Sequence, residues 1–135
     1  MTNSFLEKLK TDFKPSPFSE FIGLQMKELQ EGHVELYLPF NPSFNNGHNS
    51  VHGGVYATVL DTVMGLVGKT LGFSEVMTIQ LNIQFLKPVI ECAIYSEATV
   101  VHQRRNTVLV EGKLFDEEKN LIAHSTGTFK VSKGA

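Results

Sequence analysis

The amino-acid sequence predicts an α+β fold in which a mostly antiparallel sheet packs against one long, buried helix. Apolar and polar residues alternate with a period of two over most of the chain, which is typical of strands with one buried face. Residues 54–71 differ, because they carry too many apolar residues for one amphipathic face and indicate a helix buried nearly all round. The strand-like segments follow one another through short turns, and strands joined in this way are antiparallel. We therefore expect the helix on one face of the sheet.

Length and composition are those of an ordinary globular domain. We expect residues 1–135 to form a single domain, with residues 1–22 as an N-terminal helical extension. The formal net charge of -2 lacks the basic excess that nucleic-acid binding usually needs, so no nucleic-acid partner is expected. The first residues carry mixed charge without the apolar core of a signal peptide, and no later run is apolar enough for a membrane helix. These features favour a cytoplasmic protein without a membrane partner.

The first part of the chain predicts short helices followed by a hairpin. Residues 4–9 can form a short helix, which the prolines of "KPSPF" (Lys14–Phe18) interrupt before a further helical turn in "FSEFIG". From Leu24 the period changes to two, and a turn at Glu31-Gly32 separates "LQMKELQ" from "HVELYLPF". Residues 41–52 then form a long loop rich in Asn, Ser, Gly and His, and loops of this length in compact domains are often functional.

Four strand-like segments follow the long helix. The first, "MTIQLNIQFLKPV", alternates cleanly, and its apolar side is expected to comprise Met77, Ile79, Leu81, Ile83 and Phe85. The other three are expected at Cys92–His102, Thr107–Phe115 and Leu121–Val131. The only cysteine, Cys92, is interpreted as a packed small hydrophobe rather than a nucleophile, since no activating residue accompanies it in the sequence.

An aspartate in the middle of the apolar helix is the most unusual feature of the sequence. Asp61 has no Lys or Arg at the positions three and four residues away, so no neighbour on the helix can neutralise it. One interpretation is structural: the carboxylate faces solvent or bonds to a loop backbone. The other, which we prefer, is functional, because a carboxylate in an apolar and partly dry site is suited to act as a general base or nucleophile.

Two glycines mark the start of the same helix. The first unpaired backbone N–H groups and the positive end of the helix dipole should lie at Gly53 and Gly54. Because neither residue has a side chain, a substrate oxygen can approach these N–H groups closely. This is an oxyanion-binding arrangement, although a Gly-Gly pair is also compatible with simple turn geometry. Gly53 and Asp61 are eight residues apart, or about 12 Å along a helix. One carbonyl can contact both only if two helices from a twofold dimer lie side by side in opposite senses.

The stretch from Asn46 to Asp61, "NGHNSVHGGVYATVLD", resembles the hotdog-fold acyl-CoA thioesterases of the phenylacetic-acid-degradation (PaaI-like) type. The resemblance extends through "TIQLNIQFLKPV" and "VVHQRRNTVLVEGKLFD" to "AHSTGTF", which is nearly the whole chain from Leu24. It implies a hotdog fold, in which the sheet wraps around the helix. It also implies hydrolysis of acyl- or aryl-CoA thioesters without a metal or a dissociable cofactor, by a homodimer as the minimal active unit within a homotetramer.

The resemblance also implies roles for individual residues. Asp61 matches the acidic residue that activates water or attacks the thioester, and Gly53 the residue whose N–H polarises the carbonyl. Asn46 matches the loop amide that helps to hold the substrate, and His52 a structural brace for the loop. Thr78 stands where these enzymes often place a Ser or Thr that orients the water, although alternation alone makes it an ordinary surface residue of its strand.

Substrate-binding residues beyond the reacting centre are less constrained by the sequence. Gly54 belongs to the same glycine pair, and Arg104 and Arg105 occupy a turn where the family commonly reads Gly-Arg. Both arginines could contact the phosphates of coenzyme A or simply form a solvated tip, and Arg104 replaces the usual glycine. Four phenylalanines either belong to the core or line an acyl pocket for an aromatic or medium-chain group: Phe13, Phe18, Phe21 and Phe44.

The sequence is also compatible with two other functions and with a zinc site. A hotdog-fold hydratase or dehydratase would use His48 or His52 with Asp61 as an acid and base pair. A non-catalytic acyl-CoA-binding protein would use the same pocket without turnover. A zinc site at His48 and His52 is disfavoured, because the two histidines lie in a loop and no third ligand is near them in the sequence.

Overall fold

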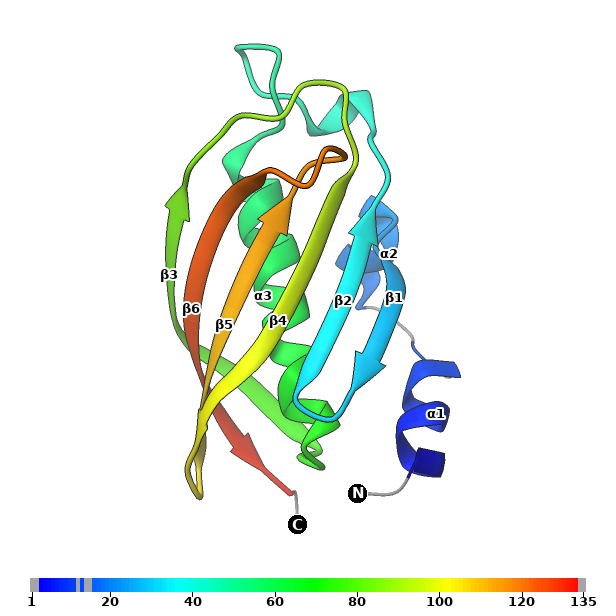
Figure 1. The fold of residues 1–135 in the computed structure, drawn as a ribbon, viewed down its shortest axis with the longest axis vertical. Helices are drawn as coiled ribbons and strands as arrows, with labels where there is room; N and C mark the ends of the chain where they lie inside the picture. Colours follow the sequence, from blue (N-terminus) through cyan, green and yellow to red (C-terminus); the bar gives the residue numbers. More distant parts are fainter. Residues whose placement is uncertain (1–2, 12, 14–15, 134–135) are drawn as a thin grey trace.

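A six-stranded antiparallel sheet curves over one long helix (Figure 1). The computed structural model describes residues 3–11, 13 and 16–133. Its elements are α1 (Asn3–Thr11), α2 (Pro17–Ile22), β1 (Gln25–Gln30), β2 (His33–Leu38), η1 (Pro42–Phe44), α3 (Gly53–Thr70), β3 (Glu75–Phe85), β4 (Ile94–Gln103), β5 (Thr107–Phe115) and β6 (Leu121–Ser132). The strand order is β1-β2-β4-β5-β6-β3, with antiparallel neighbours throughout. This arrangement confirms the predicted α+β hotdog class.

Several element boundaries differ from the sequence prediction, most by one or two residues. α3 begins at Gly53 rather than Gly54, because His52 caps the helix. β3 begins at Glu75, two residues before the expected start. Cys92 does not lie in a strand as expected, since β4 begins only at Ile94. Of the predicted helix-breaking segment Lys14–Phe18, the first two residues lie outside the described part of the chain, as do residues 1–2 and 134–135 of the expected domain.

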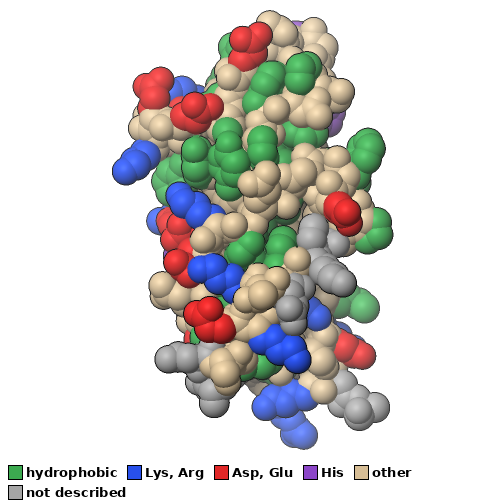
Figure 2. All heavy atoms as spheres, turned by 90° about the vertical axis from the view of Figure 1, so that its right-hand side faces the viewer, with side chains coloured by type: hydrophobic (Ala, Val, Ile, Leu, Met, Phe, Trp, Pro, Cys, Tyr) green, Lys and Arg blue, Asp and Glu red, His purple; other side chains and the backbone are tan. Residues whose placement is uncertain are grey.

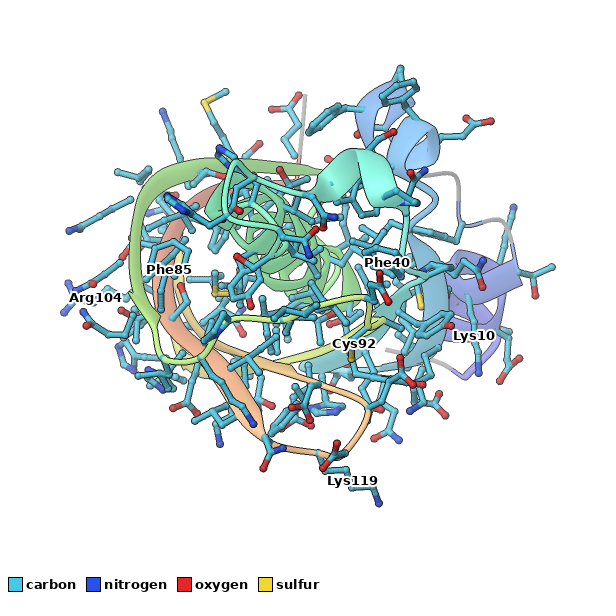
Figure 3. All side chains as sticks on the ribbon, turned by 90° about the horizontal axis from the view of Figure 1, so that it is seen from above. Lys10, Phe40, Phe85, Cys92, Arg104 and Lys119 are labelled. Carbon is cyan, nitrogen blue, oxygen red and sulfur yellow. The ribbon has the colours of Figure 1, made fainter. Side chains whose placement is uncertain are left out.

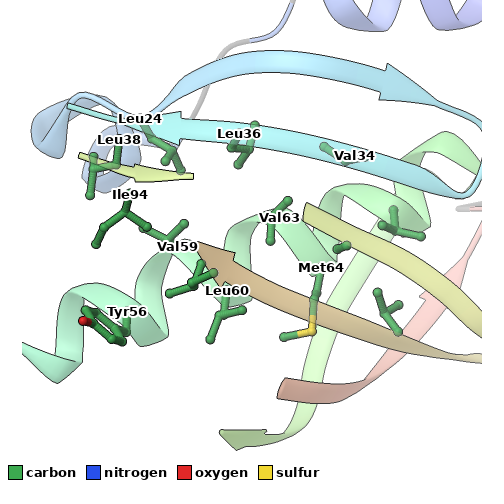
Figure 4. Packing of buried hydrophobic residues seen from close by; sticks show 14 of the residues in the cluster. Leu24, Val34, Leu36, Leu38, Tyr56, Val59, Leu60, Val63, Met64 and Ile94 are labelled. Atoms are coloured by element: carbon green, nitrogen blue, oxygen red, sulfur yellow. The ribbon is translucent and has the colours of Figure 1, made fainter. Parts of the chain in front are cut away.

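The sheet covers only one side of α3, so the prediction of a helix buried nearly all round was wrong for a single chain. The side that packs against the sheet is buried and contains Tyr56, Val59, Leu60, Val63 and Met64 (Figure 4). The buried Val67 continues this side of the helix. The opposite side is half-buried and contains small or polar residues, namely Ala57, Thr58, Asp61, Thr62 and Gly65. The apolar excess that suggested burial on all sides is therefore concentrated on one face, and the polar face of α3 has no sheet over it.

Close packing between α3 and the middle of the sheet depends on Gly112 of β5. A Cβ atom at Gly112 would lie 2.9 Å from Met64 Cγ and 3.1 Å from Leu60 Cδ2. Both of these side chains are fully buried. The missing side chain at Gly112 therefore lets the helix approach the sheet, and the approach fixes where every residue of α3 lies relative to the strands.

β3 forms one edge of the sheet and contains a bulge. Its register against β6 shifts between Thr78 and Gln80, so one extra residue is inserted in β3. The inserted residue reverses the alternation, and the expectation of one continuous apolar side was wrong: Met77 and Ile79 are 68% and 57% exposed, whereas Leu81 packs against the core. Thr78 thereby turns toward α3, where a regular strand would have placed Met77.

No helix in the described part of the chain combines the length and apolar character needed to cross a membrane.

Gly112→Ala is expected to destabilise the protein by about 1–3 kcal/mol, because the added methyl group overpacks the contact with Met64 and Leu60. Urea unfolding followed by circular dichroism measures the change. Gly47→Ala is the matched control: nothing lies within 4 Å of its Cβ position, so the change should stay within about 0.5 kcal/mol. Equal stability of the two variants would contradict the proposed close approach of α3.

Candidate active site

Asp61 is held by a hydroxyl from the sheet edge. Thr78 Oγ1 donates a hydrogen bond of 2.6 Å to Asp61 Oδ1, and the β3 bulge is what brings the threonine to the helix. Asp61 is half-buried in the single chain, less than the sequence suggested, and it bonds to a strand hydroxyl rather than to a loop backbone. A hydroxyl donor to one carboxylate oxygen orients the group and leaves the other oxygen available.

A shallow pocket of about 300 Å³ opens beside this pair. Its lining includes Asp61 and Thr78 together with Phe13, Leu66 and Lys69. Lys69 was not singled out in the sequence, because its position eight residues after Asp61 says nothing about a shared pocket until the helix and β3 are in place. Its ammonium group donates a hydrogen bond of 2.6 Å to Ser74 O rather than to Asp61.

The start of α3 leaves one backbone donor free. His52 Nδ1 accepts a hydrogen bond of 2.7 Å from Gly54 N, and His52 O accepts one of 2.9 Å from Val55 N. Gly53 N has no acceptor among the described residues. Gly54 was expected to offer its N–H to substrate, but this N–H caps the helix in the single chain, and a Cβ there would lie 2.9 Å from His52 Nδ1. The free donor at the positive end of the helix dipole is therefore Gly53 N–H.

The loop before α3 is shaped by Asn46. Its Oδ1 accepts from His48 N at 2.7 Å and from Ser50 N at 3.2 Å, and its Nδ2 donates to Ser50 Oγ at 3.0 Å. The side chain therefore braces the loop from within. Asn45, which the sequence did not distinguish from its neighbour, has a buried Oδ1 with no hydrogen-bond partner among the described residues. Only the tertiary structure separates the two asparagines.

The four phenylalanines of the predicted acyl pocket do not lie together. Phe18, Phe21 and Phe44 line a pocket of about 490 Å³ that also contains Asn45, His52, Gly54 and Thr58, whereas Phe13 lines the pocket beside Asp61. Phe18 and Phe21 of α2 are 58% and 84% exposed. Hydrophobic side chains gather in the upper part of the face in Figure 2, which is the side of the molecule that carries α2. An apolar surface thus adjoins the start of α3.

Tyr56 and Phe85 support the first turn of α3. Their rings stack with centroids 5.9 Å apart, and a Cβ at Gly53 would lie 3.3 Å from Phe85 Cε1. Tyr56 OH donates to Lys87 O at 2.9 Å, and burial raises the pKa of Tyr56 to about 12, so this donor stays protonated at neutral pH. Burial also raises the pKa of the Cys92 thiol, which agrees with the interpretation of Cys92 as an unreactive residue.

Arg104 and Arg105 lie far from the predicted site residues Asn46 and His52 of the same chain. Both are exposed in the β4–β5 turn, which is at the opposite end of the molecule from the loop that precedes α3 (Figure 1). Arg104 N donates to Thr107 O at 2.8 Å and closes the turn, and its side chain lies at the outer rim of the molecule (Figure 3). In the described part of the chain, neither His48 nor His52 belongs to a group of three potential metal ligands.

Comparison with known proteins identifies the family. The sequence model of the thioesterase superfamily matches residues 48–123, which is more than half of the chain. The chain belongs to the thioesterase superfamily. The predicted membership of the hotdog-fold thioesterases and the assignment as a thioester hydrolase are thereby confirmed.

Solved structures share the fold over most of their length. The PaaI protein of the E. coli phenylacetic acid degradation operon superimposes with a TM-score of 0.88 at 19% identity, covering 97% of this chain and 95% of that one. The protein smu.793 of Streptococcus mutans, bound to acetyl CoA, superimposes with a TM-score of 0.80 at 25% identity, covering 90% of this chain and 94% of that one. A hypothetical thioesterase protein of Streptococcus pneumoniae with coenzyme A superimposes with a TM-score of 0.78 at 27% identity, covering 82% of this chain and 90% of that one. The same S. pneumoniae protein was also solved with an aspartate or a threonine replaced by alanine.

His52→Ala is expected to lower the free energy of unfolding by about 1 kcal/mol, because it removes the side-chain acceptor that caps α3. His52→Asn should retain most of that stability, since asparagine is a favourable N-cap residue. Urea unfolding of the two variants and the wild type measures the difference. An asparagine variant as unstable as the alanine variant would show that His52 acts through packing rather than as a cap.

Proposed function

We propose that the protein hydrolyses acyl- or aryl-CoA thioesters to the free acid and CoA at two sites, each shared between two copies of the chain. The observation that carries the proposal is the placement of two complementary groups on one continuous helix. Gly53 supplies a free N–H at the start of α3, and Asp61 supplies a carboxylate oriented by Thr78. Their separation of about 12 Å along the helix is too large for one carbonyl to contact both within a chain.

The edge of β3 supports a twofold dimer. This strand has 11 residues without proline or lysine, which are the residues that commonly protect an edge from pairing. Pairing of two β3 edges in antiparallel fashion would continue the sheet across the dimer and cover the exposed Met77, Ile79 and Phe85. The uncovered faces of the two α3 helices would then lie side by side in opposite senses, so that Gly53 of one copy faces Asp61 of the other.

In the proposed reaction the thioester carbonyl oxygen accepts a hydrogen bond from Gly53 N–H, and the helix dipole stabilises the negative charge that develops on it. Asp61 either takes a proton from the attacking water or attacks the carbonyl itself. Thr78 occupies Oδ1 of the carboxylate, which leaves Oδ2 for this step. If Asp61 acts as the base, collapse of the tetrahedral intermediate breaks the C–S bond and releases the acid, and the proton taken up by Asp61 passes to the thiolate of CoA. If Asp61 attacks, collapse breaks the C–S bond and leaves a mixed anhydride on Asp61; water then hydrolyses this anhydride, which releases the acid, restores the carboxylate and supplies the proton of the CoA thiol.

The related structures with acetyl CoA and CoA support a CoA thioester as the substrate. The aspartate and threonine replaced in the S. pneumoniae protein are the same residue types as the Asp61–Thr78 pair. The use of His52 Nδ1 in capping α3 disfavours a hydratase that relies on this histidine as an acid or base. Substrate contacts by Asn46, Gly54, Arg104 and Arg105, a homotetramer, a cytoplasmic location and the absence of a cofactor remain predictions.

Asp61→Asn and Asp61→Ala are expected to lower kcat by at least about a hundredfold, because they remove the base or nucleophile. Thr78→Val should lower kcat by roughly tenfold through loss of a hydrogen bond to a charged group, and Thr78→Ser should restore most of it. Steady-state hydrolysis of aryl-, short- and medium-chain acyl-CoAs measures each effect. Unchanged turnover in both Asp61 variants would exclude the mechanism, and saturable acyl-CoA binding by an inactive wild type would favour the non-catalytic binding protein.

Hybrid dimers test whether each site uses two chains. Gly53→Pro removes the backbone N–H at the first position of α3, a position at which helices tolerate proline. The preceding residue, His52, already has the extended backbone conformation that a following proline requires. Gly53→Pro and Asp61→Asn homodimers should be inactive. Random mixing should restore roughly a quarter of the wild-type activity, because half of the dimers are then hybrids with one intact site of two. Purified hybrids without activity would show that each site belongs to one chain.

A further inference from the structure

Three potential metal ligands lie together on the face of the sheet that points away from α3. His33 and Glu35 belong to β2, and Glu97 belongs to β4. They alternate with buried residues that face the helix, such as Val34, Leu36 and Ala98. In the β2–β4 register Glu35 stands directly opposite Glu97, and His33 stands opposite Thr99. The cluster therefore rests on two adjacent strands of the sheet rather than on a loop.

The donor atoms are close enough for one ion. One imidazole nitrogen and one oxygen from each carboxylate all lie within 4.8 Å of one another, and His33 Nε2 is 3.0 Å from Glu35 Oε2. Ligands that bind zinc at about 2.0–2.2 Å in tetrahedral geometry are separated by roughly 3.4 Å, so small side-chain rotations suffice. In the described part of the chain this is the only such group of three or more residues. All three side chains are half-buried.

Among the described residues, no lysine or arginine bridges the two carboxylates. Like charges directly opposite each other on neighbouring strands are destabilising, and Glu97 makes no ion pair or hydrogen bond with any residue that the structure describes. Lys113 is the register partner of Glu97 on β5 but forms no ion pair with it. The ammonium group of Lys27 lies 4.9 Å from the centre of the Tyr95 ring instead of between the carboxylates.

The orientation of His33 matches that of a metal ligand. Its Nδ1 lies 2.8 Å from Thr99 Oγ1, which holds the ring so that Nε2 points at the carboxylates. Ligand histidines are commonly oriented in this way, by a hydrogen bond at the ring nitrogen that does not bind the metal. If the Nδ1–H donates to Thr99, Nε2 of the neutral ring presents a lone pair to the cluster, and a cation between it and the carboxylates satisfies all three groups.

The geometry points to a divalent transition-metal site, best suited to Zn²⁺, formed by His33, Glu35 and Glu97. Glu35 and Glu97 also border an open pocket of about 430 Å³, so water can reach the ion and complete its coordination. A bound ion would neutralise the facing carboxylates and join β2 to β4. The site lies on the opposite face of the sheet from α3 and Asp61, so it stabilises the fold and takes no part in the proposed hydrolysis.

The same face contains a matched control. His124 Nε2 of β6 lies 2.8 Å from Glu111 Oε2 of β5, and the hydrogen bond from His124 lowers the pKa of Glu111. This pair reproduces the His–Glu contact without a third ligand within reach among the described residues. Loss of the His124 side chain should therefore leave specific metal binding unchanged, whereas loss of the Glu97 carboxylate should weaken it.

Titration of EDTA-treated, tag-free protein with Zn²⁺ by calorimetry, and with Co²⁺ by visible absorption, tests the site. We expect one ion per chain and a thermal midpoint that rises with Zn²⁺. Glu97→Gln and His33→Gln should each weaken binding by at least about tenfold, and Thr99→Val by about tenfold through loss of the orienting bond. His124→Gln should bind like the wild type.

Three results would overturn the proposal: no saturable binding by the wild type, undiminished binding by Glu97→Gln, or equal losses in Glu97→Gln and His124→Gln. Glu97→Gln preserves the shape of the side chain and removes a facing charge, so it keeps the test valid should His33→Gln fail to fold. Acyl-CoA hydrolysis without added metal should be unchanged in Glu97→Gln, which makes the outcome independent of the proposed reaction.

Discussion

One-sided packing of α3 against the sheet is the constraint on which the rest of this structure depends. The buried side of the helix, from Tyr56 to Val67, is apolar because it contacts the strands, and Gly112 permits the close approach. A sheet that covers one side of a helix leaves the other side either in contact with another part of the protein or a partner, or exposed to solvent. In this chain that other side carries Thr58, Asp61 and Thr62, which are half-buried rather than fully exposed. The groups proposed to act on the substrate thus lie on the surface that the core does not use.

The backbone around α3 determines which groups remain available for chemistry. At the start of the helix, His52 engages Gly54 N–H through its ring and Val55 N–H through its carbonyl, which leaves the Gly53 N–H as the free donor. In β3, one inserted residue turns Thr78 toward the helix, where it binds one oxygen of Asp61 and leaves the other. A cap and a bulge, both local irregularities, therefore select one donor and one acceptor from several chemically similar candidates.

The two faces of the sheet carry separate sets of polar groups. The face toward α3 supports the Asp61–Thr78 pair, whereas the opposite face carries paired histidines and glutamates from β2, β4, β5 and β6. Strand alternation keeps these sets apart, since residues two apart share a face and adjacent residues do not. Changes on the outer face can therefore alter stability without contacting the Asp61–Thr78 pair.

Local periodicity and helix geometry were enough to predict the class of fold, the number of strands and the placement of Gly53 and Asp61 on one helix about 12 Å apart. Tertiary structure alone decided that the polar side of α3 lies outside the core, that Cys92 precedes its expected strand, and that Thr78 meets Asp61. It also decided that His33, Glu35 and Glu97 form one cluster. The physical reason is common to these cases: strand register, bulges and cross-strand neighbours arise from contacts between residues distant in the chain, which local alternation cannot specify.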